Sequence, residues 1–273
     1  MLLTIKTADE EIAIVSLPSF DAEVMGMPIN SLFVIFLLLN IFEQAICQQT
    51  NNIFTKQLWL DFNPEYTINS KFILYGRSDV RTIFPQALYR FVVGGGIAYK
   101  RKPYWNKRAE DEFHAGIGFF YTLNLHNPDR LEIRPYQGYR LRYPNFARIQ
   151  VQNYVRLEER FEFTVNGGEE FGLRLRYLVQ GTFHFKNSNN RNLKSFYFPV
   201  SAEFFFNLNG TDQFNDLIRV GPGLGCLFPS GWRPEFDLKF HRTRGTVDEK
   251  FTTSDLVFRF RLFYKIPDKK KEQ

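Results

Sequence analysis

The stretch Leu256–Tyr264 reads L-V-F-R-F-R-L-F-Y. Its apolar residues occupy every second position, and Arg259 and Arg261 fall between them. Because successive side chains of a β-strand point to opposite faces, this spacing predicts a strand with one apolar, aromatic face and one charged face. The same pattern recurs along most of the chain, so it decides the fold class.

Ten further segments show this alternation and are separated by turn residues such as Asn166-Gly167-Gly168. Pro64 interrupts the first segment, which predicts a bulge or a sheet edge at that point. The eleven expected strands cover Gln57–Ile68, Phe72–Arg81, Ala87–Tyr99, Glu112–Leu123, Leu131–Arg142, Arg148–Phe163, Phe171–Phe183, Phe196–Phe206, Ile218–Phe228, Arg233–His241 and 253–265.

The apolar face of these strands is too large for one small core, since the chain holds 31 phenylalanines and is 17% aromatic. Exposed to water, such a face is an aggregation hazard, whereas in lipid it is the outer band of a barrel. A mean hydropathy of −0.29 excludes a bundle of membrane-spanning helices. We therefore predict an all-β fold, an antiparallel up-and-down transmembrane β-barrel. A soluble β-sandwich or lipocalin-like barrel is the alternative.

The number of strands is expected to be even, because single-chain bacterial barrels keep both chain ends on one side of the membrane. We therefore expect ten or twelve strands and not eleven. Either the first segment, broken by Pro64, splits or lies outside the wall, or another strand lies near Ile53-Phe54.

The chain before the barrel resembles an export signal. Ser31–Phe42 is an apolar run that is too short to span a membrane, and Ala45-Ile46-Cys47 offers small residues for cleavage after Cys47. The expected organisation is an over-extended start over 1–24, a signal peptide over 25–47, a barrel over 48–265 and a charged tail over 266–273. A lipidated Cys47 and an N-terminal helix that stays attached are the alternatives.

The segment 48–273 carries 34 basic and 23 acidic residues, a net charge of +11. A nucleic-acid partner fits poorly, because the basic residues alternate with apolar ones and do not form a stripe or a tail. Only Cys226 remains after cleavage, so no internal disulfide is expected.

If the apolar faces point outward, charged residues of several strands point into the lumen. Opposite charges there are expected to pair and to close the lumen. Because arginines outnumber acids, a binding site or pathway for an anionic solute is the other interpretation. Asn153 and Glu159 fall on the outer face in this scheme, which suggests a bulge in their strand. The candidate site is the lumen charge network of Glu132, Arg134, Arg140, Arg156, Glu158, Arg160, Glu162, Arg174, Arg176, Arg259 and Arg261.

Several short motifs, taken in order, resemble a known family. They are W-L-D-F-N-P (Trp59–Pro64), R-P-Y-Q (Arg134–Gln137), R-L-E-E-R-F (Arg156–Phe161), R-x-R-Y (Arg174–Tyr177) and R-V-G-x-G-x-G (Arg219–Gly225). The chain is similar over roughly residues 55–265 to a domain-of-unknown-function family of predicted Gram-negative outer-membrane β-barrel proteins. The resemblance implies a barrel and an outer-membrane location but no activity. Nine residues follow Tyr264, whereas outer-membrane proteins commonly end on an aromatic residue.

No catalytic residue, metal site or cofactor is predicted. The four histidines, His114, His126, His184 and His241, stand in no metal-binding spacing, and no serine lies in a nucleophile elbow. We expect a structural or small-solute transport role in the outer membrane, reached through a cleavable signal peptide. The alternatives are a lipid-active enzyme with a rim histidine, or a surface protein that binds lipopolysaccharide through loops 100–111 and 242–250. Expected partners are outer-membrane lipid, the barrel-assembly machinery and lipopolysaccharide, and not nucleic acid.

Overall fold

The computed structural model describes residues 2–6, 12–16, 55–84, 88–101, 109–124, 128–143, 148–165, 167–185, 195–209, 214–246 and 248–267. The chain divides into two units, Met1–Gln49 and Thr50–Gln273. In the first unit, β1 (Leu2–Lys6) and β2 (Ile12–Ser16) pair antiparallel. The predicted signal peptide over 25–47, the segment Ile53-Phe54 and nearly all of the charged tail lie outside the described residues.

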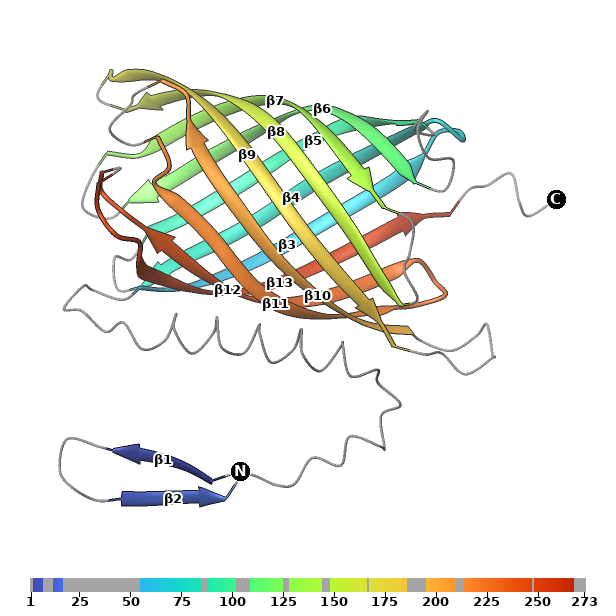
Figure 1. Ribbon diagram of the computed structural model, residues 1–273. Coiled ribbons are helices and arrows are strands. Elements are labelled where there is room, and N and C mark those ends of the chain that lie inside the picture. Colours follow the sequence, from blue (N-terminus) through green and yellow to red (C-terminus); the bar gives the residue numbers. More distant parts are fainter. Residues whose placement is uncertain are drawn as a thin grey trace. The chain divides into compact units, whose positions relative to one another are not determined.

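The second unit is a closed barrel of tilted strands (Figure 1). Each strand pairs with the next one along the chain, so the all-β class and the up-and-down order are confirmed. The strands are β3 (Thr55–Thr67), β4 (Phe72–Phe84), β5 (Leu88–Arg101), β6 (Glu110–Asn124), β7 (Arg130–Arg142), β8 (Ile149–Thr164), β9 (Glu169–His184), β10 (Ser195–Asn207), β11 (Leu217–Leu227), β12 (Trp232–Thr243) and β13 (Thr252–Ile266).

The expectation of ten or twelve strands is wrong, because the described barrel closes with eleven. With an odd number, the first and last strands run in the same direction. They pair parallel from Asp255 opposite Thr55 to Ile266 opposite Tyr66, while the other neighbouring strands of the barrel pair antiparallel. The expectation of an even number of strands failed because it assumed that the first and last strands pair antiparallel. Backbone hydrogen bonding also permits parallel pairing of these two strands.

The predicted alternation of faces is present in the wall. On β13 and β3, Phe260 and Leu60 are about half exposed, whereas Val257 and Asp61 are buried. The two expected bulges are absent: the β3–β4 register is unchanged on either side of Pro64, and β8 pairs without a shift past Asn153 and Glu159. Among the described pairings, the register shift lies in β12–β13, between His241 and Arg242.

Glycine is required in a tight turn of the barrel and at positions in the strands where a neighbouring tyrosine comes close. Gly167 has a φ of 86° in the turn that links β8 to β9, as the Asn-Gly-Gly sequence predicts. In the strands, a Cβ on Gly116 would lie 2.5 Å from the Tyr136 hydroxyl, and one on Gly96 would lie 2.6 Å from the Tyr75 hydroxyl. These glycines leave room for tyrosine side chains that lie against the inner wall. Among the described residues, no helix is long and apolar enough to cross a membrane.

Candidate functional site in the barrel lumen

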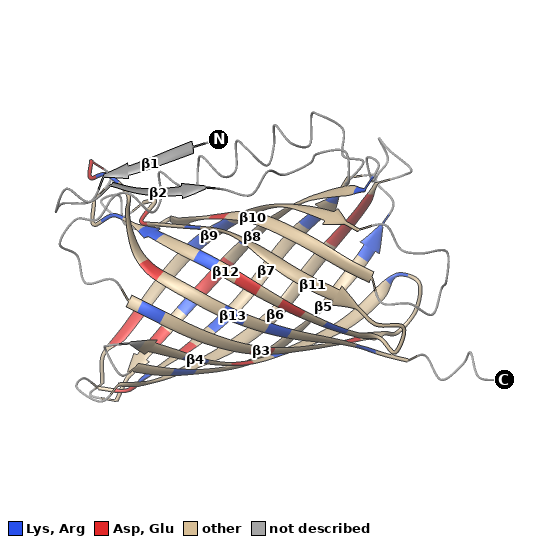
Figure 2. Ribbon diagram, turned by 90° about the horizontal axis from the view of Figure 1, so that it is seen from below, with Lys and Arg blue, Asp and Glu red and all other residues tan. Residues whose placement is uncertain are grey.

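Basic and acidic residues lie along the strands between the two rims (Figure 2). All eleven residues of the predicted charge network form ion pairs. Eight of them, on β7, β8 and β9, join into one connected cluster, whereas Arg140, Arg259 and Arg261 pair elsewhere. The structure therefore shows where these side chains lie, and their role in a function stays a prediction.

Glu158 is the centre of the connected cluster, and its side chain is fully buried. One carboxylate oxygen accepts from Arg156 and, at 2.7 Å, from Arg176, while the other accepts from Arg174 at 2.7 Å. Arg134 approaches the second oxygen at 3.5 Å. One carboxylate thus faces four guanidinium groups from three neighbouring strands.

The cluster continues on both sides of Glu158. Glu132 accepts from Arg134 at 2.6 Å and from Arg160 at 2.7 Å, and Arg160 also pairs with Glu162. On the other side, Glu203 of β10 pairs with Arg176 and lies 3.5 Å from Arg219 of β11. Sequence reasoning missed Glu203 and Arg219, although both occupy inward positions of the alternating pattern.

A second group of charges lies on β3, β4 and β13. Asp61 accepts from Arg259, and Arg77 lies 3.9 Å from the same carboxylate. Asp79 accepts from Arg77 at 2.5 Å and from Arg81 at 2.7 Å. The Asp61–Arg259 pair depends on the barrel closure that brings β13 beside β3, whereas Arg77, Asp79 and Arg81 pair within β4.

The two groups face a common cavity of about 90 Å³ inside the lumen. Its lining contains nine arginines from seven strands, and Trp59 and Phe120 are the other two lining residues. The arginines are Arg77, Arg81, Arg90, Arg134, Arg160, Arg174, Arg176, Arg219 and Arg259. None of the described residues that line this cavity carries a carboxylate.

Aromatic rings hold several of these guanidinium groups in place. Arg81 lies over the Trp59 ring at 4.0 Å and Arg134 over the Phe120 ring at 3.9 Å. Arg219 lies 4.5 Å from the centre of the buried Phe205 ring. Stacking on a ring leaves the N–H edges of a guanidinium group free to bind acceptors in its plane.

Arg140 and Arg261 belong to smaller, separate groups. Arg140 pairs with Glu112 at 3.2 Å, and Glu112 also accepts from Arg142 at 2.6 Å. Arg261 pairs with Glu235 and, at 2.6 Å, with Asp237, whose neighbour Lys239 donates to Ser201 at 2.7 Å. The lumen therefore contains several ionic groups, of which the arginine-lined cavity is the largest gathering of one sign.

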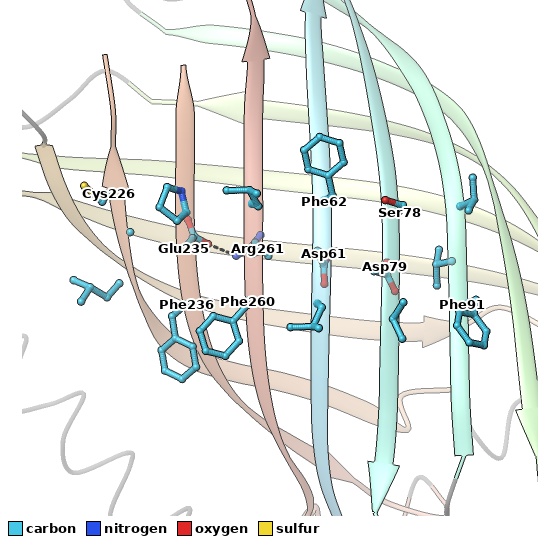
Figure 3. A pocket seen from close by; sticks show the side chains of 18 of the residues that line it. Asp61, Phe62, Ser78, Asp79, Phe91, Cys226, Glu235, Phe236, Phe260 and Arg261 are labelled. Atoms are coloured by element: carbon cyan, nitrogen blue, oxygen red, sulfur yellow. Dashed lines mark hydrogen bonds and ion pairs between the residues drawn. The ribbon is translucent and has the colours of Figure 1, made fainter. Parts of the chain in front are cut away.

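The outer surface carries a groove of about 710 Å³ whose lining is mainly apolar (Figure 3). Phe236 and Phe260 lie side by side across β12 and β13, with ring centres 4.9 Å apart, and Phe62 and Phe91 line it farther along. Glu235 and Arg261 form an ion pair on the inner face of the same strands. The wall thus separates an apolar outside from a charged inside within the thickness of one sheet.

The described histidines do not form a catalytic arrangement. His241 Nδ1 lies 3.4 Å from Asp255, but the Ser254 hydroxyl donates to that same carboxylate and to the backbone carbonyl of His241, and not to the imidazole ring. His114 lies 3.3 Å from Glu112, and its ring packs against the rings of Tyr75 and Tyr154. No group of three potential metal ligands occurs among the described residues, and His126 lies outside them.

At the rims of the barrel, where lipopolysaccharide binding was expected, polar and charged side chains contact one another. Arg101 pairs with Asp111 at 3.0 Å across the ends of β5 and β6, while residues 102–108 lie outside the described residues. At another loop, the Tyr121 hydroxyl donates to Asp129 at 2.6 Å and the Asn124 N–H donates at 3.1 Å, which holds the pKa of Asp129 below its usual value. Lipopolysaccharide binding by loops 100–111 and 242–250 stays a prediction.

Comparison with known proteins assigns the chain to a family. No curated protein matches it in sequence. A family model described as "Protein of unknown function (DUF2490)" matches residues 56–252, which run from the first strand of the barrel to the start of the last. This match includes every predicted network residue except Arg259 and Arg261. The chain therefore belongs to this family of proteins of unknown function.

Proposed function

We propose that the protein is an outer-membrane β-barrel whose wall is embedded in lipid. The supporting observation is the outer face, where large apolar side chains stay exposed along successive strands, among them Leu60, Val93 and Phe260. Exposed apolar surface on this scale is unusual for a soluble monomer. Strands of 11 to 16 residues are long enough to span a membrane when tilted. The apolar run Ser31–Phe42 supports export.

We further propose that the lumen is closed and that the barrel has a structural role. Glu158, Glu132 and Asp61 each bind two or more guanidinium groups, so the inner side chains are tied to one another between the rims. In barrels of about this size, side chains can fill the interior. The cavity of about 90 Å³ holds roughly three water molecules and is too small for a continuous channel by itself.

Transport of a small anion is the second candidate function, and the arginine-lined cavity favours it. A narrow lumen lined by one sign of charge attracts counter-ions and selects for them. In this function the ion pairs would open transiently and the arginines would pass an anion from one rim to the other. Proteoliposomes loaded with phosphate would lose it at a rate proportional to the amount of protein, whereas a structural barrel would retain it.

Location is tested by fractionating cells that express the full chain and by comparing boiled with unboiled samples on a gel. We expect the protein in the outer-membrane fraction, with a shift in mobility on heating that reports a stable barrel. Recovery in a soluble fraction, with no heat-dependent shift, would contradict the proposal.

A further inference from the structure

We propose that the arginine-lined cavity is a binding site for one compact, multiply charged oxyanion of the phosphate or sulfate class. The proposal deepens the role of the lumen and rests on its charge and geometry. It does not depend on the membrane location. The site would serve equally in a closed barrel, where the anion completes the network, and in a transporter, where the anion is cargo.

The charge balance around the cavity favours an anion. Among the described residues, the nine lining arginines share six carboxylate partners, so at least three positive charges have no carboxylate to balance them there. The carboxylates bind the arginines from the wall and do not line the cavity. A dianion held among these guanidinium groups would reduce their mutual repulsion.

Donors of the lining arginines remain available for a ligand. Arg90 donates to the Thr122 hydroxyl at 2.8 Å and has no carboxylate partner among the described residues. The Nε of Arg219 is buried and has no hydrogen-bond partner among the described residues. A buried donor without an acceptor is costly, and an anion oxygen in the cavity would supply acceptors.

The size of the cavity limits the ligand. A volume of about 90 Å³ corresponds to roughly three water molecules. This space suits a tetrahedral oxyanion, whose several oxygens accept from guanidinium forks in different directions. A sugar phosphate or a nucleotide is larger than this space.

Trp59 provides a direct optical test, because it is buried and lies in the lining of the cavity. Replacing the other two tryptophans by W105F and W232F leaves it as the single reporter in the full-length chain. This variant, purified in detergent micelles, is titrated with sodium phosphate and with sodium sulfate, and sodium chloride at matched ionic strength serves as the control. We expect a saturable change in fluorescence with phosphate or sulfate and none with chloride.

Two variants and a matched control locate the site. Arg90→Gln and Arg219→Gln each remove a lining donor, and each should weaken phosphate binding about tenfold or more, the usual effect of losing a charge-assisted hydrogen bond. Arg140→Gln removes a lumen arginine that pairs with Glu112 outside the cavity and should leave binding unchanged. Heat-dependent mobility on a gel verifies that each variant is folded.

Glycerol phosphate tests whether the site binds a free oxyanion or the phosphate ester of a lipid headgroup. We expect it to compete poorly, because its glycerol group exceeds the cavity. A phosphate response no larger than that to chloride would overturn the proposal, as would an equal loss in the Arg140→Gln control. Equal binding of glycerol phosphate would overturn the assignment to a free, compact oxyanion. Failure of the location test would leave these results unaffected.

Discussion

Replacing Glu158 by glutamine tests whether the ionic network holds the barrel together. The substitution keeps the shape of the side chain and removes the one negative charge that faces Arg134, Arg156, Arg174 and Arg176. One carboxylate oxygen becomes an NH2 group, which is a donor directed at other donors. The side chain is fully buried, so water cannot replace the lost acceptor.

The expected cost is large because a buried charge pair loses one partner. Breaking such a pair typically costs about 3–5 kcal/mol, since the remaining charge is left buried and unpaired. Arg156 and Arg174 lose their one carboxylate partner among the described residues, whereas Arg134 keeps Glu132 and Arg176 keeps Glu203, so we expect a loss of unfolding free energy within that range. Removing one arginine as well, in Glu158→Gln with Arg174→Gln, should recover part of the loss because it relieves the repulsion among the remaining cations.

The assay is equilibrium unfolding in urea of the chain refolded in detergent micelles, with tryptophan fluorescence as the signal. Glu169→Gln is the control, because Glu169 is exposed at the start of β9 and surface substitutions usually change stability by less than about 0.5 kcal/mol. A loss below about 1 kcal/mol for Glu158→Gln, or a double variant less stable than expected from adding the two single changes, would refute the reasoning.

Three further predictions concern the wall. Cysteines at Leu60 and Phe260, in a background that carries Cys47→Ser and Cys226→Ser, should form a disulfide across the parallel closure, and failure to cross-link under oxidation would contradict the eleven-strand barrel. Gly116→Ala should destabilise the barrel by about 1–3 kcal/mol, because its Cβ would collide with Tyr136, whereas Gly181→Ala, which meets no atom within 4 Å, should be neutral or slightly stabilising in the same urea assay. Phe258→Arg should cost about 2–4 kcal/mol when the barrel is refolded into lipid vesicles if its side chain faces the middle of the bilayer, and equal stability to the wild type would contradict a lipid-facing wall.

Sequence reasoning predicted the strands well because the alternation is a local property. Each expected strand overlaps one strand of the barrel, and Glu132, Glu158 and Arg174, which the alternation places on the inner faces of β7, β8 and β9, form ion pairs in the structure. The boundaries differ by a few residues, and most strands are longer than expected because backbone pairing continues past the alternating residues.

The closure and the cavity escaped sequence reasoning because both depend on contacts between distant segments. The parallel pairing of β3 with β13 joins residues about 200 positions apart, and no local pattern indicates its direction. Arg81, Arg219 and Arg259 meet around Trp59 only after the sheet has closed. Their inward direction followed from the alternation, but their convergence needed the register of the complete barrel.

Conductance across a planar lipid bilayer tests most directly the proposal that this barrel spans a membrane with a closed lumen. The same protein preparation is reconstituted into vesicles in parallel, where its heat-dependent mobility verifies insertion. For the wild type we predict no steady conductance, and for Glu158→Gln we predict opening events, because the loosened arginines no longer tie neighbouring strands together. A steady, protein-dependent conductance of the wild type would contradict the closed lumen, and a failure to insert would contradict the membrane barrel itself.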